Sequence, residues 1–189
     1  WNTEGTKGIS GGVVKVGSGA IFDFSQTVML PAGQYKMTAQ AVYRYSCAEQ
    51  SEYDAIQAGT ETRLAKLYAE TSSYKYEVAV QNRYDGASDT DYAAGSGSVT
   101  VNGKFVPNSS AAVQTWFNNG QYVNELVFNV QEDGQVKIGI AKTESPEAGD
   151  YANIGAWTLT RLGDAEADPK EEEPTPEEPE TPIYTMVQN

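Results

Sequence analysis

Residues 34–46 read QYKMTAQAVYRYS, and apolar and polar side chains alternate along this stretch. The alternation gives two sets, an apolar one of Tyr35, Met37, Ala39, Ala41, Tyr43 and Tyr45, and a polar one of Gln34, Lys36, Thr38, Gln40 and Arg44. A period of two residues is typical of a strand with one buried face, because successive side chains point to opposite sides. The stretch therefore predicts a half-buried strand of an antiparallel sheet.

The same alternation recurs on both sides of this strand. It precedes the turn LPAG (30–33) in the set Phe22, Phe24, Gln26, Val28 and Leu30. It returns around QEDGQ (131–135) in the sets Tyr122, Leu126, Phe128, Val130 and Val136, Ile138, Ile140. Asp133-Gly134 between two such runs predicts a hairpin, and a last strand is expected around 156–162. Seven to nine short strands predict an all-β fold, an antiparallel β-sandwich.

One short helix is expected over residues 108–119. Asn108 or Ser109 suits its N-cap, because a short side-chain oxygen accepts from the free amides of a first turn. Gly120 suits the position just past its end, where a positive φ is common. Ala112, Val113, Trp116 and Phe117 share one face of this helix by their spacing.

The aromatic pair Trp116 and Phe117 has two interpretations. The two rings fill the core, or they form a surface on which a ligand binds. We expect Phe117 and Tyr122 to be buried, with the helix covering one end of the sandwich. We expect the larger ring of Trp116 to keep an accessible edge beside Asn118 and Asn119, because so short an element cannot bury it fully.

The order of strands and loops predicts where a binding site lies. If the strands run alternately up and down, the tight turns at 30–33, 72–74 and 131–135 fall at one end. The long segments 46–62, 84–107 and 144–153, together with the helix, then fall at the other end. Loops on a rigid scaffold are where binding residues concentrate, so the end with the long loops is the expected binding end.

Composition excludes several kinds of chemistry. The 189-residue chain contains no histidine and a single cysteine, Cys47. Nucleophile systems that depend on histidine and histidine-ligated zinc are therefore impossible within it. One cysteine cannot form an intramolecular disulfide, so the core must hold the domain together. Only carboxylate chemistry, of the kind used by glycosidases, stays open.

The net charge of −13 is divided unevenly along the chain. Residues 164–182 contain nine acids and one lysine, which leaves −5 for the rest. Proline and like charges predict that this stretch is an extended acidic linker after a domain over residues 1–163. Residues 183–189 (IYTMVQN) are expected to begin a following segment or to add an edge strand.

The sequence also gives expectations about nucleic-acid binding, membrane insertion and the parent polypeptide. The body has no basic stripe of the kind that nucleic-acid binding requires, and no apolar run approaches the ~20 residues of a membrane-spanning helix. Because the chain begins at Trp1, we expect it to be an excerpt of a longer polypeptide whose targeting signals lie elsewhere.

Several stretches in order resemble one known family. They are FDFSQTVMLPAGQYKMTAQAVYR (22–44), LAKLYAE (64–70), VPNSSAAVQTWFNNGQYVNELVFNV (106–130), GQVKIGIAK (134–142) and IGAWTLTRL (154–162). Together they resemble a galactose-binding-like jelly-roll domain of secreted or surface-attached glycan-handling proteins of gut bacteria. The resemblance covers nearly all of residues 1–163. It implies a non-catalytic carbohydrate-binding module that is joined to other domains, outside the cytoplasm.

The resemblance also raises the question of a structural calcium ion. Relatives commonly close with an aromatic-Asp-Asn-aromatic stretch near which some hold calcium, whereas residues 157–160 here read WTLT and lack the acid. Asp85, Asp89 and Asp91 offer hard oxygens of the type calcium prefers. Their spacing matches no known calcium loop, so a solvated acidic loop is the competing interpretation.

The chain contains twelve tyrosines, and this high number is the most informative feature of its composition. Aromatic rings suit the apolar face of a sugar but are equally ordinary filling of strands. Tyr35, Tyr43 and Tyr122 are assigned to the core. The expected ligand-binding residues are Tyr53, Tyr84, Asp85, Tyr92, Trp116 and Asn118. Packing of the three loop tyrosines within their own loops is the alternative.

Three functions remain. The leading one is a non-catalytic module that binds a glycan or polysaccharide. The second is a structural spacer, or an adhesive or protein-binding domain, of a large surface protein. The third is a glycosidase, which would need a deep cleft with two carboxylates. Arg44 is expected to pair with a loop carboxylate or to contact a ligand.

Overall fold

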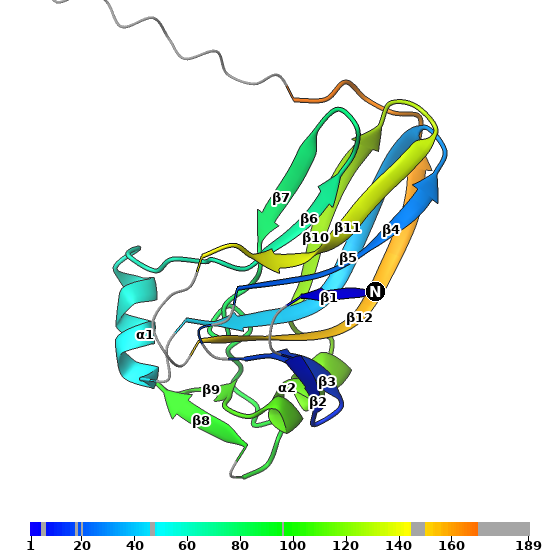
Figure 1. Ribbon diagram of the computed structural model, residues 1–189. Helices are drawn as coiled ribbons and strands as arrows, with labels where there is room; N and C mark the ends of the chain where they lie inside the picture. The colour runs from blue at the N-terminus through cyan, green and yellow to red at the C-terminus, as the bar shows by residue number, and fades with distance from the viewer. Residues whose placement is uncertain are drawn as a thin grey trace, which may run out of the picture.

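The computed structural model describes residues 1–4, 7–17, 19, 21–45, 48–95, 97–144 and 150–169, most of which form two facing β-sheets (Figure 1). Within these residues, sheet A has the strand order β1 (Asn2–Glu4), β4 (Phe22–Leu30), β11 (Gly134–Lys142), β6 (Lys66–Glu70) and β7 (Lys75–Ala79). Sheet B has the order β10 (Val123–Val130), β5 (Gly33–Arg44), β12 (Tyr151–Gly163), β3 (Val13–Val16) and β2 (Lys7–Ser10). All these pairings are antiparallel, so the predicted all-β fold is confirmed.

Residues 34–44 of that stretch lie in β5, which stands in sheet B between β10 and β12. Its apolar set points into the space between the sheets, where Tyr35, Met37 and Tyr43 are buried. Residues from both sheets complete this core, including Leu67, Phe128 and Ile140. The assignment of Tyr35, Tyr43 and Tyr122 to buried positions is also confirmed.

The predicted hairpin at Asp133-Gly134 is wrong. β10 pairs with β5 in sheet B, whereas β11 lies between β4 and β6 in sheet A, so this turn carries the chain from one sheet to the other. The Oδ1 atom of Asp133 accepts a hydrogen bond of 2.8 Å from the amide of Ala32, which joins this turn to the turn after β4, where the chain also passes from one sheet to the other. Two strands that face each other across a core show the same alternation as two paired strands.

The two ends of the sandwich differ as expected. In Figure 1 the turns that follow β4, β6 and β10 gather at one end, and the helices and the small β8–β9 sheet gather at the other. The expectation of a single helix is wrong, because the described residues contain α1 (Glu49–Gln57) in addition to α2 (Ser110–Asn118). The only buried residue of α1 is Glu52. A helix without an apolar stripe leaves no periodic signal in the sequence.

Other segments that were expected to be loops are strands. Residues 84–107 include a hairpin of β8 (Ser98–Val101) and β9 (Lys104–Pro107). Asn102 and Gly103 turn it with φ values of 47° and 76°, as an Asn-Gly hairpin requires. β12 begins at Tyr151, inside the expected loop 144–153. Residues 145–149 of that loop and Cys47 lie outside the described residues.

A second hydrophobic core lies where α2 packs on sheet B. It consists of Val13, Val42, Ala112, Val113, Trp116, Phe117 and Tyr122. The side chain of Ser109 caps the helix by accepting from the amide of Ala112, and Gly120 beyond its end has a φ of +76°. Phe117 and Tyr122 are buried as predicted, but the predicted accessible edge of Trp116 is wrong, because Trp116 is 0% exposed.

The first residues of the acidic stretch lie against the sandwich. The carboxylate of Asp168 accepts hydrogen bonds from Ser73 Oγ (2.6 Å), Tyr76 Oη (2.5 Å) and Gln131 Nε2 (2.8 Å). Residues 170–182 of the predicted linker and the segment 183–189 lie outside the described residues. Neither helix of the described part of the chain has the length and apolar character needed to cross a membrane.

Candidate functional site

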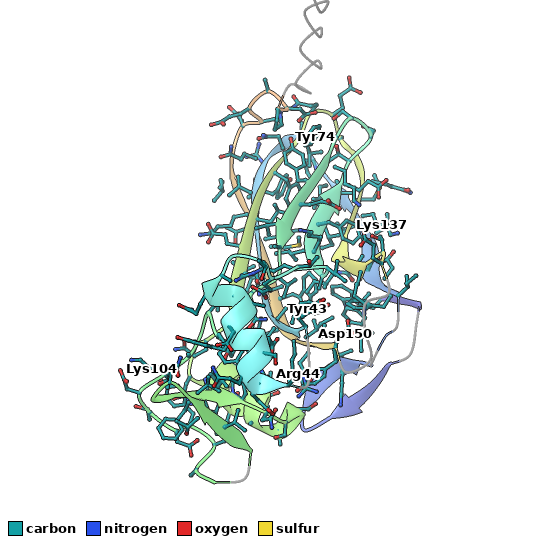
Figure 2. The ribbon with its side chains drawn as sticks, turned by 90° about the vertical axis from the view of Figure 1, so that its left-hand side faces the viewer. Tyr43, Arg44, Tyr74, Lys104, Lys137 and Asp150 are labelled. Atoms are coloured by element: carbon teal, nitrogen blue, oxygen red, sulfur yellow. The ribbon has the colours of Figure 1, made fainter. Side chains whose placement is uncertain are left out.

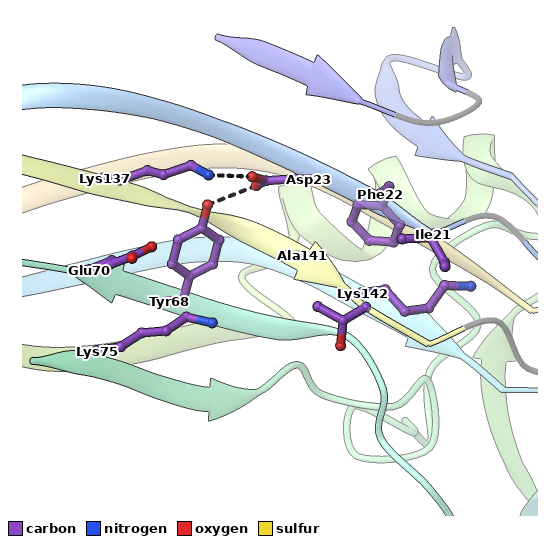
Figure 3. Close-up of a pocket in the computed structure, with 10 residues that line it drawn as sticks. Ile21, Phe22, Asp23, Tyr68, Glu70, Lys75, Lys137, Ala141 and Lys142 are labelled. Carbon is purple, nitrogen blue, oxygen red and sulfur yellow. Dashed lines mark hydrogen bonds and ion pairs between the residues drawn. The ribbon is translucent and has the colours of Figure 1, made fainter.

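The outer face of sheet A carries a groove made of two adjoining pockets. Their volumes are about 300 Å³ and 420 Å³, and both are lined by Lys75, Ala141 and Thr143. The first pocket, shown in Figure 3, also contains Asp23, Tyr68 and Lys137. These side chains point outward because they alternate with core residues of β4, β6 and β11.

Small residues of β11 make room for this groove. Gly139 lies between Lys137 and Ala141 on the outer face of the strand. A Cβ atom at Gly139 would come within 2.9 Å of Tyr68 Cε1 and within 2.7 Å of the carbonyl oxygen of Phe24. Glycine at position 139 therefore lets the ring of Tyr68 lie on β11. Any residue with a side chain at position 139 would collide with that ring.

A three-residue cluster stands at the centre of the first pocket (Figure 3). The Oδ1 atom of Asp23 accepts a hydrogen bond of 2.8 Å from the hydroxyl of Tyr68, and its Oδ2 atom accepts one of 2.6 Å from Lys137 Nζ. The three residues come from β4, β6 and β11, so neighbouring strands hold the cluster in place. Such fixed donors and acceptors favour ligand binding, because little freedom is lost when a ligand arrives.

The cluster shifts the pKa of each member. Burial works to raise the pKa of Asp23, but the hydrogen bonds from Lys137 and Tyr68 oppose it, and the pKa lies below its ordinary value. The hydrogen bond to Asp23 raises the pKa of Lys137. Burial, aided by Asp23, raises the pKa of Tyr68 to about 12. At neutral pH the cluster is therefore an ion pair with a protonated tyrosine.

The lowered pKa of Asp23 predicts how the stability of this face depends on pH. Folding favours the ionised carboxylate, so its contribution to stability is present above the unfolded pKa and is lost as the pH falls through the folded pKa. Asp23→Asn is therefore expected to reduce stability at neutral pH and to have a smaller effect at about pH 3. Urea unfolding of both chains at the two pH values measures this. Equal losses at both pH values would contradict the assignment.

Further charged groups surround the cluster. Lys75 Nζ lies 5.2 Å from the centroid of the Tyr68 ring and pairs with Glu77 at 2.5 Å, where both side chains are close to half exposed. Glu70 lines the first pocket, and Lys66 lines the second. The groove thus presents ammonium donors next to carboxylate acceptors, an arrangement that suits a ligand with several hydroxyl groups.

The structure divides the predicted site residues into two groups. Tyr53 and Tyr84, both partly buried, pack edge to face with ring centroids 5.5 Å apart. The hydroxyl of Tyr84 donates to the carbonyl of Glu49 at 2.6 Å. Asp85 pairs with Arg63 and accepts from the amide of Asn82 at 2.8 Å. These contacts anchor the loop to α1, and a ligand role for the three residues stays a prediction.

The second group consists of Trp116 and Asn118 of α2 and of Tyr92, which packs on this helix. Tyr92 packs edge to face on Trp116 with centroids 5.2 Å apart, so its ring covers the second core. Asn118 is exposed and accepts from Gln114 Nε2 at 2.9 Å. Because Trp116 has no exposed surface, it cannot be a platform for a ligand in this conformation.

The three aspartates proposed for calcium have separate partners. Asp85 pairs with Arg63, and Asp89 pairs with Lys104 at 2.6 Å. Asp91 accepts from Ser98 Oγ and from the amides of 93–95, so it holds a turn. Among the described residues, no group of three acidic, cysteine or histidine side chains is placed to hold a metal ion.

A buried charge network joins α1 to the sandwich. Glu52 Oε2 accepts a hydrogen bond of 2.8 Å from Arg83 Nε and lies 2.6 Å from Arg83 Nη2 in an ion pair, and both side chains are at most 2% exposed. Glu52 Oε1 accepts from Asn82 Nδ2 and from the amide of Tyr45. Arg83 Nη1 also donates to Asn108 Oδ1 at 2.9 Å. This network, together with the packing of Tyr53 on Tyr84, joins α1 to the loops at that end.

Arg44 adds to the same end of the molecule. Its Nη1 donates to the side-chain oxygen of Asn108 at 3.2 Å, and its guanidinium lies 4.1 Å from the centroid of the Tyr151 ring. Arg44 thus contacts a side-chain amide and an aromatic ring, and its expected pairing with a loop carboxylate or a ligand stays a prediction.

Sequence reasoning did not identify the groove residues. Asp23, Tyr68, Lys75 and Lys137 occupy outward positions of their strands, and the sequence analysis gave none of them a role. The signal that was present is Tyr68 itself, a large aromatic residue on the polar side of a strand, opposite the small Gly139 of the neighbouring strand. Comparison of the chain with family models, with curated proteins and with solved structures found no match in any of the three.

Proposed function

We propose that this domain is a non-catalytic carbohydrate-binding module with a galactose-binding-like jelly-roll fold, part of a larger secreted or cell-surface protein. The fold assignment is supported by two facing antiparallel sheets between which the chain crosses after β4 and after β10. The sequence resemblance is the support for a location outside the cytoplasm and for adjoining domains in the same polypeptide.

The groove on sheet A is the observation that carries the proposal. Its two pockets, of about 300 Å³ and 420 Å³, are each of the size of a small-molecule site. Asp23, Glu70 and Glu77 offer acceptors for sugar hydroxyls, and Lys66, Lys75 and Lys137 offer donors. A ring stacked on a sugar is not the basis here, because Tyr68 is only 2% exposed.

The chemistry of the groove favours binding over hydrolysis. A glycosidase needs one carboxyl group whose pKa is raised so that it acts as the acid. Burial works to raise the pKa of Asp23, but the hydrogen bonds from Lys137 and Tyr68 oppose it, and the pKa is lowered. The ionised carboxylate is suited to accept hydrogen bonds from a ligand, and it is poorly suited to protonate one.

We predict that Lys75→Ala weakens glycan binding about tenfold or more, as expected for loss of a charged hydrogen-bond donor. A glycan array screened with the full chain identifies the ligand, and calorimetry then compares the variants. Lys104→Ala is the matched control, because Lys104 is another exposed lysine paired with a carboxylate, at 2.6 Å. In Figure 2 Lys104 lies well away from Lys137, at the lower left of the view, whereas Lys137 lies near mid-height on the right. The control is expected to bind like the wild type.

Other results would redirect or contradict this proposal. Loss of binding in Tyr53→Ala with full binding in Lys75→Ala would move the site to the loops. Release of reducing sugar would contradict the non-catalytic role. Absence of binding to every glycan on the array would favour the alternative, a structural spacer or an adhesive or protein-binding domain.

A further inference from the structure

Lys142 and Asp150 form an ion pair inside the protein. Lys142 is the last residue of β11 in sheet A, and Asp150 directly precedes β12 in sheet B. Lys142 Nζ donates to Asp150 Oδ2, and the two side chains are 1% and 0% exposed. The pair therefore spans the two sheets without contact with solvent. The Lys137–Asp23 pair on sheet A differs, because those side chains are 40% and 19% exposed.

The carboxyl group of Asp150 has two further donors. The hydroxyl of Tyr43, a residue with no exposed surface, donates to Oδ2 at 3.1 Å. The amide of Gly19 donates to Oδ1 at 2.7 Å. Figure 2 shows Tyr43 and Asp150 close together in the interior. One carboxylate oxygen thus faces an amine and a hydroxyl, and the other faces a fixed backbone amide.

This arrangement brings together the parts of a condensation reaction. Burial of two charges is costly, and transfer of a proton from Nζ to Oδ2 removes both. The products of that transfer are a free amine and a carboxylic acid in contact. Fixed contact between reacting groups corresponds to an effective concentration of about 10⁵–10⁸ M in well-oriented cases.

We propose that Lys142 and Asp150 condense to an amide bond that joins the two sheets covalently. The Nζ lone pair attacks Cγ of Asp150, the Nζ–Cγ bond forms, and the Cγ–Oδ2 bond breaks. Oδ2 leaves as water with two protons that come from the lysine ammonium, the second of them relayed by the Tyr43 hydroxyl. The Gly19 amide stabilises the negative charge that develops on Oδ1. The reaction needs no oxidant and no co-reactant.

The amide bond would give this domain a covalent cross-link between its sheets, which a disulfide cannot supply in a chain with one cysteine. With one cysteine the chain has no intramolecular disulfide. An amide between residues 142 and 150 closes a short loop and restricts the unfolded chain in the way a disulfide does. Unlike a disulfide, it is insensitive to reducing agents.

The experiment is an intact-mass measurement on the denatured full chain. We expect the mass to be lower than that of the sequence by one water molecule. Trypsin is then expected to leave residues 138–161 as one peptide that is uncut after Lys142 and lighter by one water. Further cleavage at Glu144 and Glu147 should leave two pieces that remain joined. Tyr43→Phe should reduce the cross-linked fraction.

Matched variants distinguish this bond from other losses of water. Lys142→Met and Asp150→Ala are expected to show full mass, whereas Lys137→Met is expected to keep the loss. Asp85-Gly86 and Asp133-Gly134 could lose water by forming succinimides, but succinimides hydrolyse in mild base and the amide persists. A wild-type chain of full sequence mass would overturn the proposal, and so would a loss of water that persists in Lys142→Met.

Discussion

Glu52→Ala is expected to lower the free energy of unfolding by about 3–5 kcal/mol, the cost of leaving one partner of a buried ion pair alone. Arg83 is 2% exposed at its side chain, and Glu52 accepts the hydrogen bond of its Nε and forms the ion pair with its guanidinium. Because Glu52 is the only buried residue of α1, the helix and the loops that it holds are expected to lose their position as well.

Glu125→Ala is the control for this measurement. Glu125 pairs with Lys36 at 3.4 Å on the surface, where its side chain is 54% exposed. Exposed pairs of this kind contribute about 0–1 kcal/mol. Urea unfolding of the two variants and the wild type measures the difference. If Glu52→Ala cost no more than Glu125→Ala, the buried network would not be what holds α1.

Trp116→Ala is expected to cost about 3–5 kcal/mol, the range for an emptied aromatic position in a core. The ring of Trp116 has no exposed surface and packs in the second core together with Phe117 and Val113. Removing it leaves a cavity between α2 and sheet B that its neighbours fill only in part. The ring of Tyr92, which lies against Trp116, would lose its partner.

Trp1→Ala makes the same chemical change at an exposed position. Trp1 stacks on Phe24 with ring centroids 4.7 Å apart, but it is 49% exposed. We therefore expect a clearly smaller loss of stability for this variant. Thermal or urea unfolding of both variants is sufficient. Similar losses would mean that Trp116 contributes little beyond what a surface tryptophan does.

The strands were predictable because their signal is local. Tyr35, Met37 and Tyr43 fall on one face of β5 by covalent geometry alone, whatever the strand pairs with. The cap at Ser109 and the turn at Gly120 were also predictable, since each depends on a few neighbouring residues. The same is true of the Asn102-Gly103 turn, whose signal was present in the sequence but was not used.

The groove and the position of α1 were not predictable in this way. Asp23, Tyr68, Lys75 and Lys137 are distant in the sequence, and only strand pairing brings them to one face. The buried residue of α1 is the carboxylate Glu52, so no periodic apolar pattern identifies this helix. The size of Trp116 predicted an exposed edge, but the second core supplied enough neighbours to cover the whole ring.

The sequence by itself determined the periodicity of the strands, the caps of α2 and the exclusion of histidine chemistry, because each of these depends on residue identity or on local geometry. The tertiary structure alone decided which sheet each strand joins, as β10 and β11 illustrate. It also decided which charges leave water, as for Glu52 and Lys142. The physical reason is that alternation is compatible with many pairings, whereas burial is a property of all the segments that pack around a residue.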